Sequence, residues 1–428
     1  MMDVIAKEQA CIYCKKPLLE PTGSLCYHLQ CHKLVEDYNR NRPYDRSALE
    51  SLFTALGFIH HPIYRNYSMD WFLRHNDNLL KYKLDEHSDR AIRNNFINYH
   101  TNDLNRVTHL QVNTRRYGFK LRQLPPDLFS LEELEYLSIE VGLSSIDHLG
   151  KLSKLRILNL NNNQLVQLPS DLWTLQGLES LTLMNNNVQC MPEDIGLLEN
   201  LRHIDTRGNP PQDLPESIYQ LPLLESLFIT GFGNESTLPN SVGSLTKLKQ
   251  FKVRECFISL LPDSILNLRL LENLTLDSTY VQLLPNEIGD LQRLKSLIIN
   301  HSLLNSLPKS VANMQELEFL MLRGGRFQDV PPEVWKLKKL KALFLDYNAI
   351  KTIPPEIQNL EDLRVLTLNN TNLTALPKEL LELPKLRYVN ISNTPVNHTT
   401  GFKKRGVHVE RVIPRYWTRQ LLDRHCSW

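Results

Sequence analysis

Hydrophobic and polar positions recur along most of the chain with a period of 23 residues. Residues 340–362 read LKALFLDYNAIKTIPPEIQNLED, and residues 363–385 read LRVLTLNNTNLTALPKELLELPK, with Leu, Asn or Thr, and Pro at matching positions. The shared frame is L-x-x-L-x-L-x-x-N-x-L-x-x-L-P-x-x-L-x-x-L-x-x. Its first six positions follow the pattern of a short strand, and the later L-P-x-x-L-x-x-L part indicates a turn followed by a short helix or 3₁₀ segment.

The frame covers about two thirds of the chain, and self-similarity with this period is the signature of leucine-rich repeats. Neighbouring strand segments are expected to pair into a parallel sheet on a concave face, with the leucines inward and the helical segments on the convex side. The predicted fold class is therefore an α/β solenoid, a leucine-rich-repeat horseshoe. The units begin at Val107, Leu134, Leu155, Leu178, Leu201, Leu224, Leu248, Leu271, Leu294, Leu317, Leu340 and Leu363, and a truncated unit begins at Leu386.

A polar residue follows each strand segment, where the backbone turns away from the sheet. Asn occupies this slot in several units, for example at Asn163 and Asn348. Its amide can satisfy peptide groups that have no partner in the sheet. Cys256 replaces it with a smaller hydrogen-bonding group, so we expect Cys256 to be structural, and we expect Cys190 to be buried.

The 23-residue unit with a Leu-Pro step resembles intracellular leucine-rich-repeat proteins of the Ras-suppressor and Shoc2-like group, and many bacterial repeat proteins. The resemblance extends from Val107 to about Val396. It implies a curved protein-binding scaffold with no catalysis of its own. It does not identify the partner.

A group of Cys and His residues near the amino end indicates a metal site. Pairs of such ligands separated by two residues can close on one zinc ion, because a tight turn aims both side chains at one point. The spacing predicts one structural zinc bound by Cys11, Cys14, His28 and Cys31, with Cys26 and His32 as alternates. The layout resembles a treble-clef or LIM-like half finger. Repeat proteins of the Ras-suppressor and Shoc2-like group do not usually carry such a finger.

Two other interpretations of this stretch remain open. An unmetallated Cys-rich loop is one. An active module that binds nucleic acid or acts as a ligase is the other, although a ligase RING domain needs two zinc ions and this stretch offers six candidate ligands.

The segments outside the repeats are expected to cap the solenoid, because an open array exposes the apolar edges of its terminal units. Helical periodicity predicts helices after Asp45, after Ser68 and around residues 91–99. The carboxyl-terminal segment is rich in basic residues, so a contact with nucleic acid or anionic lipid is the alternative to a strand-and-helix cap. The predicted domains are a zinc finger at 1–38, a helical connector at 39–106, about 12.5 repeat units at 107–397 and a carboxyl-terminal cap at 398–428.

Composition limits the class of protein further. Lys and Arg total 49 against 47 Asp and Glu, so the formal charge of +2 does not favour nucleic acid or anionic lipid as a general partner. No apolar run has the length of a signal peptide or a membrane span, and four of the seven Cys lie between Cys11 and Cys31. We therefore expect a cytoplasmic protein that is not an enzyme.

The partner-binding surface is expected on the concave side, where strand positions three, five, seven and eight point to solvent. Ile298, Met321 and Phe344 form an apolar row there, flanked by Phe319, which suggests an interface core with a charged rim. The alternative is that these aromatic residues reflect strand propensity and contact each other across the sheet. The predicted partner-binding residues are Arg207, Phe228, Lys252, Arg254, Asp277, Ile298, Phe319, Met321, Arg323, Phe344, Asp346 and Tyr347.

Overall fold

The structure is a computed structural model, and its described residues fall into two compact units. One unit comprises the described residues up to Gln111 together with Leu124–Glu135, and the other comprises Val112–Gln123 and the described residues from Tyr136 on. The described residues are 48, 51–52, 97–102, 106–113, 121–211, 214–231, 237–399, 401–402 and 405–411.

The first unit contains one helical stretch, strands and a 3₁₀ segment. Ala48, Ser51 and Leu52 are helical, in agreement with the helix predicted after Asp45. The helix predicted around residues 91–99 is wrong at its end, because Ile97–Thr101 forms strand β1. The backbone N–H of Asn102 donates to the carbonyl of Arg106 at 3.0 Å, which turns the chain towards the next strand, so pairing overrides the helical periodicity. Strand β2 spans Val107–Asn113, of which the part up to Gln111 belongs to this unit, and η4 spans Pro126–Ser130.

Strands β3 to β15 of the second unit pair in parallel and in chain order. Equivalent frame positions pair across each step, as Leu297 does with Leu320 and Leu320 with Leu343. The predicted solenoid with its parallel sheet is confirmed. The strands are β3 Tyr136–Glu140, β4 Ile157–Asn159, β5 Ser180–Thr182, β6 His203–Asp205, β7 Ser226–Thr230, β8 Gln250–Cys256, β9 Asn273–Thr279, β10 Ser296–Asn300, β11 Phe319–Met321, β12 Ala342–Phe344, β13 Val365–Thr367, β14 Tyr388–Asn390 and β15 His408–Glu410.

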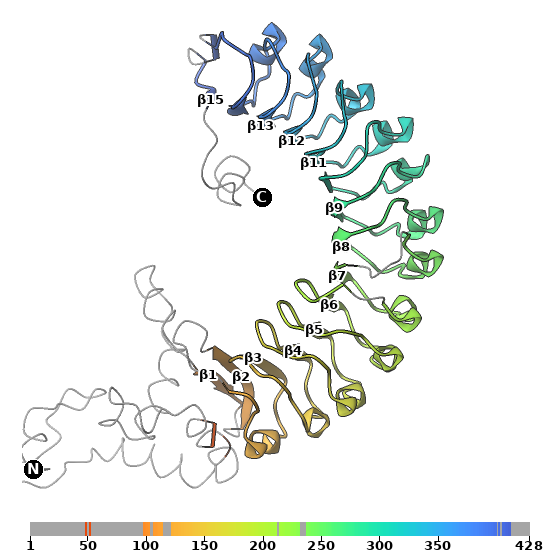
Figure 1. Cartoon of the computed structure of the whole chain (residues 1–428), viewed down its shortest axis with the longest axis vertical. Coiled ribbons are helices and arrows are strands. Elements are labelled where there is room, and N and C mark those ends of the chain that lie inside the picture. The colour runs from red at the N-terminus through yellow and green to blue at the C-terminus, as the bar shows by residue number, and fades with distance from the viewer. Residues whose placement is uncertain are drawn as a thin grey trace, which may run out of the picture. The chain divides into compact units, whose positions relative to one another are not determined.

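Short 3₁₀ helices return the chain on the outer side of these strands (Figure 1). The Leu-Pro step starts most of them, because Pro fixes its own φ and needs no hydrogen-bond partner for its nitrogen. Pro262, at φ −70° and ψ 149°, precedes one such helix. They are η5 Leu149–Lys151, η6 Ser170–Thr174, η7 Glu193–Leu197, η8 Glu216–Gln220, η9 Asn240–Ser244, η10 Asp263–Asn267, η11 Ile288–Asp290, η12 Lys309–Asn313, η13 Pro332–Lys336, η14 Pro355–Asn359 and η15 Lys378–Leu381.

The asparagine slot works as predicted. The side-chain oxygen of Asn163, Oδ1, accepts hydrogen bonds from the backbone N–H groups of Gly142 at 2.9 Å and Leu143 at 3.0 Å. Its side-chain nitrogen, Nδ2, donates to the Leu160 carbonyl at 2.8 Å. Cys256 is buried in the same slot and donates its thiol to the Arg254 carbonyl at 3.0 Å. The Asn163 side chain therefore bridges two neighbouring units, whereas the Cys256 bond stays within its own unit.

The prediction that Cys190 is buried is wrong, since its side chain is exposed. The next residue, Met191, is the one that fills the core position, with 4% of its surface exposed. After the array, β15 pairs with β14, which provides the strand of the predicted cap. No helix in the described part of the chain is both long and apolar enough to cross a membrane.

Candidate protein-binding surface

The inner face of the sheet carries a cluster of charged residues around one aromatic ring. Alternation along the strands places it there, because Ile204, Leu227 and Phe251 of β6 to β8 are buried in the core and the residues beside them in each strand point to the inner side. His203 and Asp205 come from β6, Phe228 from β7 and Lys252 from β8, and Arg207 follows β6. We call these five residues the Phe228 cluster.

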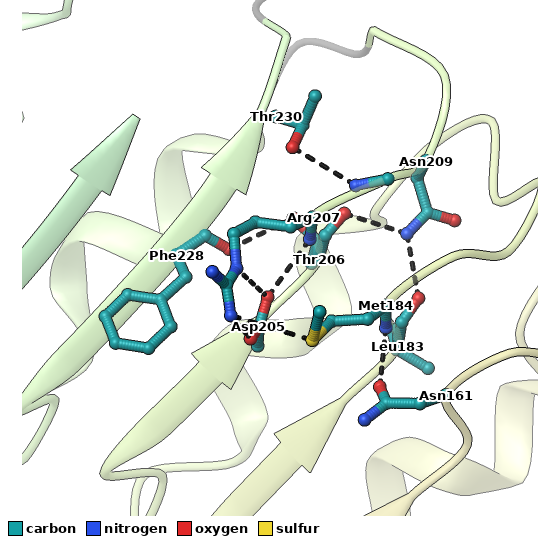
Figure 2. Close-up of polar contacts among 10 residues, drawn as sticks. Asn161, Leu183, Met184, Asp205, Thr206, Arg207, Asn209, Phe228 and Thr230 are labelled. Carbon is teal, nitrogen blue, oxygen red and sulfur yellow. Dashed lines mark hydrogen bonds and ion pairs between the residues drawn. The ribbon is translucent and has the colours of Figure 1, made fainter. Parts of the chain in front are cut away.

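An ion pair holds the Arg207 side chain against this ring. Figure 2 shows the guanidinium beside the Asp205 carboxylate, to which Nε donates at 2.9 Å and Nη2 at 2.6 Å. The Arg207 Cζ atom lies 5.0 Å from the Phe228 ring centroid, and the Lys252 ammonium lies 4.4 Å from it. His203 contacts the same ring edge-on, with centroids 5.2 Å apart. Two cations and an imidazole therefore surround one aromatic ring, and the two cations are placed for cation–π attraction.

The protonation states in the cluster follow from burial and from the Asp205 carboxylate. The hydrogen bond to Asp205 raises the pKa of Arg207, so the guanidinium carries its positive charge. Burial lowers the pKa of His203, while the nearby Asp205 charge partly opposes that shift. His203 is therefore neutral at pH 7, and the positive charge of the cluster resides on Arg207 and Lys252.

The charged surface continues onto the next two strands. Arg254 Nε lies 3.1 Å from a carboxylate oxygen of Asp277, and His301 Nδ1 lies 3.7 Å from the other oxygen. The Arg254 side chain is 47% exposed and the Asp277 side chain 16%, so solvent reaches the arginine of this pair more than the aspartate. The predicted residues Arg207, Phe228, Lys252, Arg254 and Asp277 therefore lie on adjoining strands of one surface.

A second cluster, mostly apolar, lies on the inner face of β11 to β14. It comprises Phe319, Ala342, Phe344, Val365 and Tyr388, with Ile298 and Met321 packed against its margin, and we call it the Phe344 cluster. The rings of Phe319 and Phe344 have centroids 5.0 Å apart. The structure thus brings together Ile298, Phe319, Met321 and Phe344 as expected.

The expectation that this row is open to solvent is wrong for its aromatic members. Phe319 and Phe344 each expose 3% of their surface, and Ile298 and Met321 are half-buried. The ring contact between the two phenylalanines agrees with the alternative that aromatic strand residues pack against one another across the sheet. Contact of this row with a partner stays a prediction.

Asp346 is also internal rather than solvent-facing. Its carboxylate accepts a hydrogen bond from the Thr367 hydroxyl at 2.7 Å and from the Asn369 backbone N–H at 2.9 Å. Burial raises the pKa of Asp346 to about 6, and the bonds from Thr367 and Asn369 oppose that shift. Its neighbour Tyr347 is 43% exposed, and the Arg323 guanidinium lies 4.8 Å from the Tyr347 ring centroid.

The flank of the array holds an exposed apolar patch that the frame analysis missed. Phe257 and Tyr280 stack with ring centroids 5.5 Å apart, and Leu260 forms an isolated bridge with Leu283. All four are exposed. The sequence did contain a signal for this patch. In two successive units an aromatic residue follows the asparagine slot by one position and a leucine follows it by four positions, and both positions lie on the flank rather than on the inner face.

The predicted zinc ligands Cys11, Cys14, Cys26, His28, Cys31 and His32 lie outside the described residues. Within the part of the chain that the structure describes, no group of three or more His, Cys, Asp or Glu side chains could hold a metal ion. The zinc site therefore stays a prediction from spacing.

Comparison with known proteins gives the fold. No family model and no curated protein matches the chain. Among solved structures, a leucine-rich-repeat protein of Leptospira interrogans is 29% identical with a TM-score of 0.59, over 68% of this chain and 81% of that one. An internalin, InlF, of Listeria monocytogenes is 19% identical with a TM-score of 0.53, over 67% of this chain and 90% of that one.

A plant peptide hormone receptor, RGFR1, solved in complex with RGF2, is also similar. It is 21% identical with a TM-score of 0.51, over 64% of this chain and 53% of that one. Together these likenesses establish a leucine-rich-repeat solenoid. The finer likeness to the Ras-suppressor and Shoc2-like group stays a prediction.

Proposed function

We propose that this leucine-rich-repeat solenoid is a non-enzymatic scaffold that binds a protein partner on the inner face of its sheet, at the Phe228 cluster and the adjoining Arg254–Asp277 pair. The observation that carries the proposal is the Phe228 ring flanked by Arg207 and Lys252. Aromatic residues and Arg are enriched at the energetic centres of protein interfaces. The plant receptor with the same fold was solved with a peptide hormone ligand, which supports a polypeptide partner here.

The cluster is prepared for binding in two respects. Asp205 holds the Arg207 guanidinium in place, so little side-chain freedom remains to be lost when a partner arrives. Lys252 and Arg254 sit on the same strand, two residues apart, and therefore point to the same side of the sheet. Phe228 is itself 8% exposed, so a partner meets the edge of its ring together with the more open side chains of Lys252 and Arg254.

Affinity capture from the native cell tests this surface. The bait is the full chain, and the test variant is Phe228→Ala with Lys252→Glu. Loss of a central aromatic anchor and reversal of one charge should reduce capture by about a hundredfold, since such anchors contribute about 2 kcal/mol or more each.

The matched control is Lys338→Glu, which makes the same charge reversal at an exposed residue that follows η13 on the outer side. It should capture the same protein as the parent chain. If the folded test variant retains the partner as well as Lys338→Glu does, the inner-face assignment is wrong.

The structural zinc is proposed on ligand spacing alone. Metal analysis of the purified chain should find one zinc ion, and replacing Cys11 and Cys14 with Ala should remove it. Cys190→Ala is the matched control, because this exposed thiol lies in the repeat array and should leave the metal content unchanged. Zinc retained by the double variant would exclude the proposed ligand set.

A further inference from the structure

The residue that immediately precedes each strand alternates in charge along most of the array, and we call this frame position the entry position. From β4 to β12 a basic residue and an acidic residue follow each other in strict turn. Because the strands pair in parallel and in register, each of these residues lies beside one of opposite charge in the next unit. They are Arg156, Glu179, Arg202, Glu225, Lys249, Glu272, Lys295, Glu318 and Lys341.

Ion pairs join these residues across the units. Glu225 illustrates the arrangement, because its carboxylate lies 2.9 Å from the Arg202 guanidinium on one side and 2.6 Å from the Lys249 ammonium on the other. Every other entry-position residue from β4 to β12 belongs to a pair as well. The remaining pairs are Arg156–Glu179, Lys295–Glu272 and Lys341–Glu318. A carboxylate therefore neutralises each cation of the entry position as far as β12.

The alternation ends at β13. The entry positions of β13 and β14 both hold arginines, Arg364 and Arg387. On one side of them lies Lys341, which Glu318 already pairs, and on the other lies Val407, which is apolar and 4% exposed. Arg364 is half-buried and Arg387 is exposed. Among the described residues, none forms a hydrogen bond or an ion pair with the side chain of either arginine.

Backbone hydrogen bonds hold the two arginines at a fixed spacing. The Arg364 carbonyl accepts from the N–H groups of Arg387 at 2.9 Å and Tyr388 at 3.0 Å. Neighbouring strands lie about 4.8 Å apart, so one carboxylate can reach both guanidinium groups with one oxygen to each. Asp362, two residues before Arg364, does not fill this role, because it pairs with Lys385.

We propose that Arg364 and Arg387 together bind a Glu or Asp side chain of a second protein, which supplies the carboxylate that the alternation lacks at this end of the array. Glu225 is the precedent within the chain, since one carboxylate at this frame position serves two cations. Arginine suits the role, because its planar guanidinium binds carboxylates through two N–H groups. The pair lies where the strands begin and not in the Phe228 cluster, so this inference goes beyond the proposed function and does not depend on it.

Binding of a fluorescently labelled hexaglutamate peptide to the full-length protein tests the proposal. Anisotropy is measured at low ionic strength, where exposed ion pairs are least screened. Arg364→Gln with Arg387→Gln should weaken binding about fivefold or more, since two exposed ion pairs with the peptide are lost. These changes remove no side-chain hydrogen bond between described residues, so the variant should fold, which thermal unfolding checks.

The matched control is Arg156→Gln with Lys295→Gln, which removes the same charge from the same frame position. Carboxylates already neutralise both of these cations, so hexaglutamate binding should change less than about twofold. Equal weakening by the two double variants would mean that the peptide responds to net charge alone. No binding to the parent chain, or unchanged binding to the Arg364 and Arg387 variant, would mean that the two arginines take no carboxylate. Loss of inorganic phosphate binding without loss of hexaglutamate binding would assign them to a phosphate ligand. Each of these results overturns the proposal.

Discussion

The Phe228 cluster and the Phe344 cluster occupy the same strand positions in different units of one sheet, yet they differ in what surrounds their aromatic rings. Arg207 and Lys252 flank Phe228, and these side chains remain partly open to solvent. Phe319 and other apolar groups surround Phe344, and the polar residues beside it are buried too. A regular repeat thus produces one surface suited to recognition and one that behaves as an interior.

The difference shows that position in the frame decides the direction of a side chain but not its environment. Direction follows from strand alternation, which the leucines fix in every unit. Environment depends on the side chains that neighbouring strands supply, cationic around Phe228 and apolar around Phe344. Substitutions at matched positions should therefore have very different consequences in the two clusters.

The largest difference is expected from truncating the two rings. Phe344→Ala should lower the free energy of unfolding by about 4 kcal/mol, because it leaves a cavity among buried neighbours. Phe228→Ala should cost less, about 2 kcal/mol, since Arg207 and Lys252 can move into the vacated space. Denaturant unfolding followed by circular dichroism measures both, and equal losses would contradict the division into two environments.

The next effect is the pH dependence contributed by Asp346. Its pKa in the folded protein is raised to about 6, from a usual value of 3.8, so folding favours the protonated form. Its contribution to stability is therefore complete below about pH 4 and is lost as the pH rises to about 6, by about 3 kcal/mol.

Asp346→Asn should remove this dependence. The stability of the variant relative to the parent chain should rise between pH 4 and pH 6, measured by unfolding at each pH. Asp263→Asn, at an exposed residue of η10, is the control and should leave the parent profile unchanged. A constant difference between Asp346→Asn and the parent would mean that the carboxyl is not desolvated.

A smaller effect is expected from the ion pair of the Phe228 cluster. Asp205→Asn removes the charge that orients Arg207 and should lower the free energy of unfolding by about 2 kcal/mol, because charge-assisted hydrogen bonds are lost at a buried carboxylate. It should also weaken partner capture, since Arg207 is no longer held beside Phe228. The same exposed control, Asp263→Asn, should change neither. Unchanged capture by a stable Asp205→Asn protein would mean that Arg207 needs no support to bind.

The smallest effect is the pH dependence of His203, and its sign is opposite to that of Asp346. Burial lowers the pKa of His203, so folding favours the neutral form. Its contribution to stability is present above the ordinary pKa of 6.5 and is lost as the pH falls below that value. His203→Gln should therefore lose less stability than the parent chain between pH 7 and pH 5, and a steeper loss would contradict burial of the ring.

Much of the solenoid could be predicted because its determinants are local. Three features determine it: the period of the leucines, the asparagine slot and the Leu-Pro step. Each acts within one unit or between neighbouring units, so each can be recognised in the sequence. The direction of Arg207, Phe228 and Lys252 followed from the same alternation. Their mutual contacts did not, because they depend on side-chain rotamers across three strands.

The burial of Phe344 and Asp346 could not be predicted from the frame. It depends on the side chains that neighbouring units place beside them, such as Thr367 and Asn369 beside Asp346. Cys190 illustrates the same limit on a smaller scale, since its exposure depends on Met191 taking the core position beside it. The pattern within one unit predicts its strand and its turn. It does not predict how far the side chains between the leucines are buried.

The division of the inner face is tested most directly by hydroxyl-radical footprinting of the unmodified protein, with oxidation read residue by residue. Tyr388 lies in the Phe344 cluster and is 2% exposed, whereas Tyr347, one residue beyond Asp346 in its own unit, is 43% exposed. Our account predicts that Tyr347 is oxidised at least about ten times faster than Tyr388, because oxidation follows solvent access and local opening. Equal oxidation of the two tyrosines would show that the inner face at Tyr388 is open to solvent and would contradict the account.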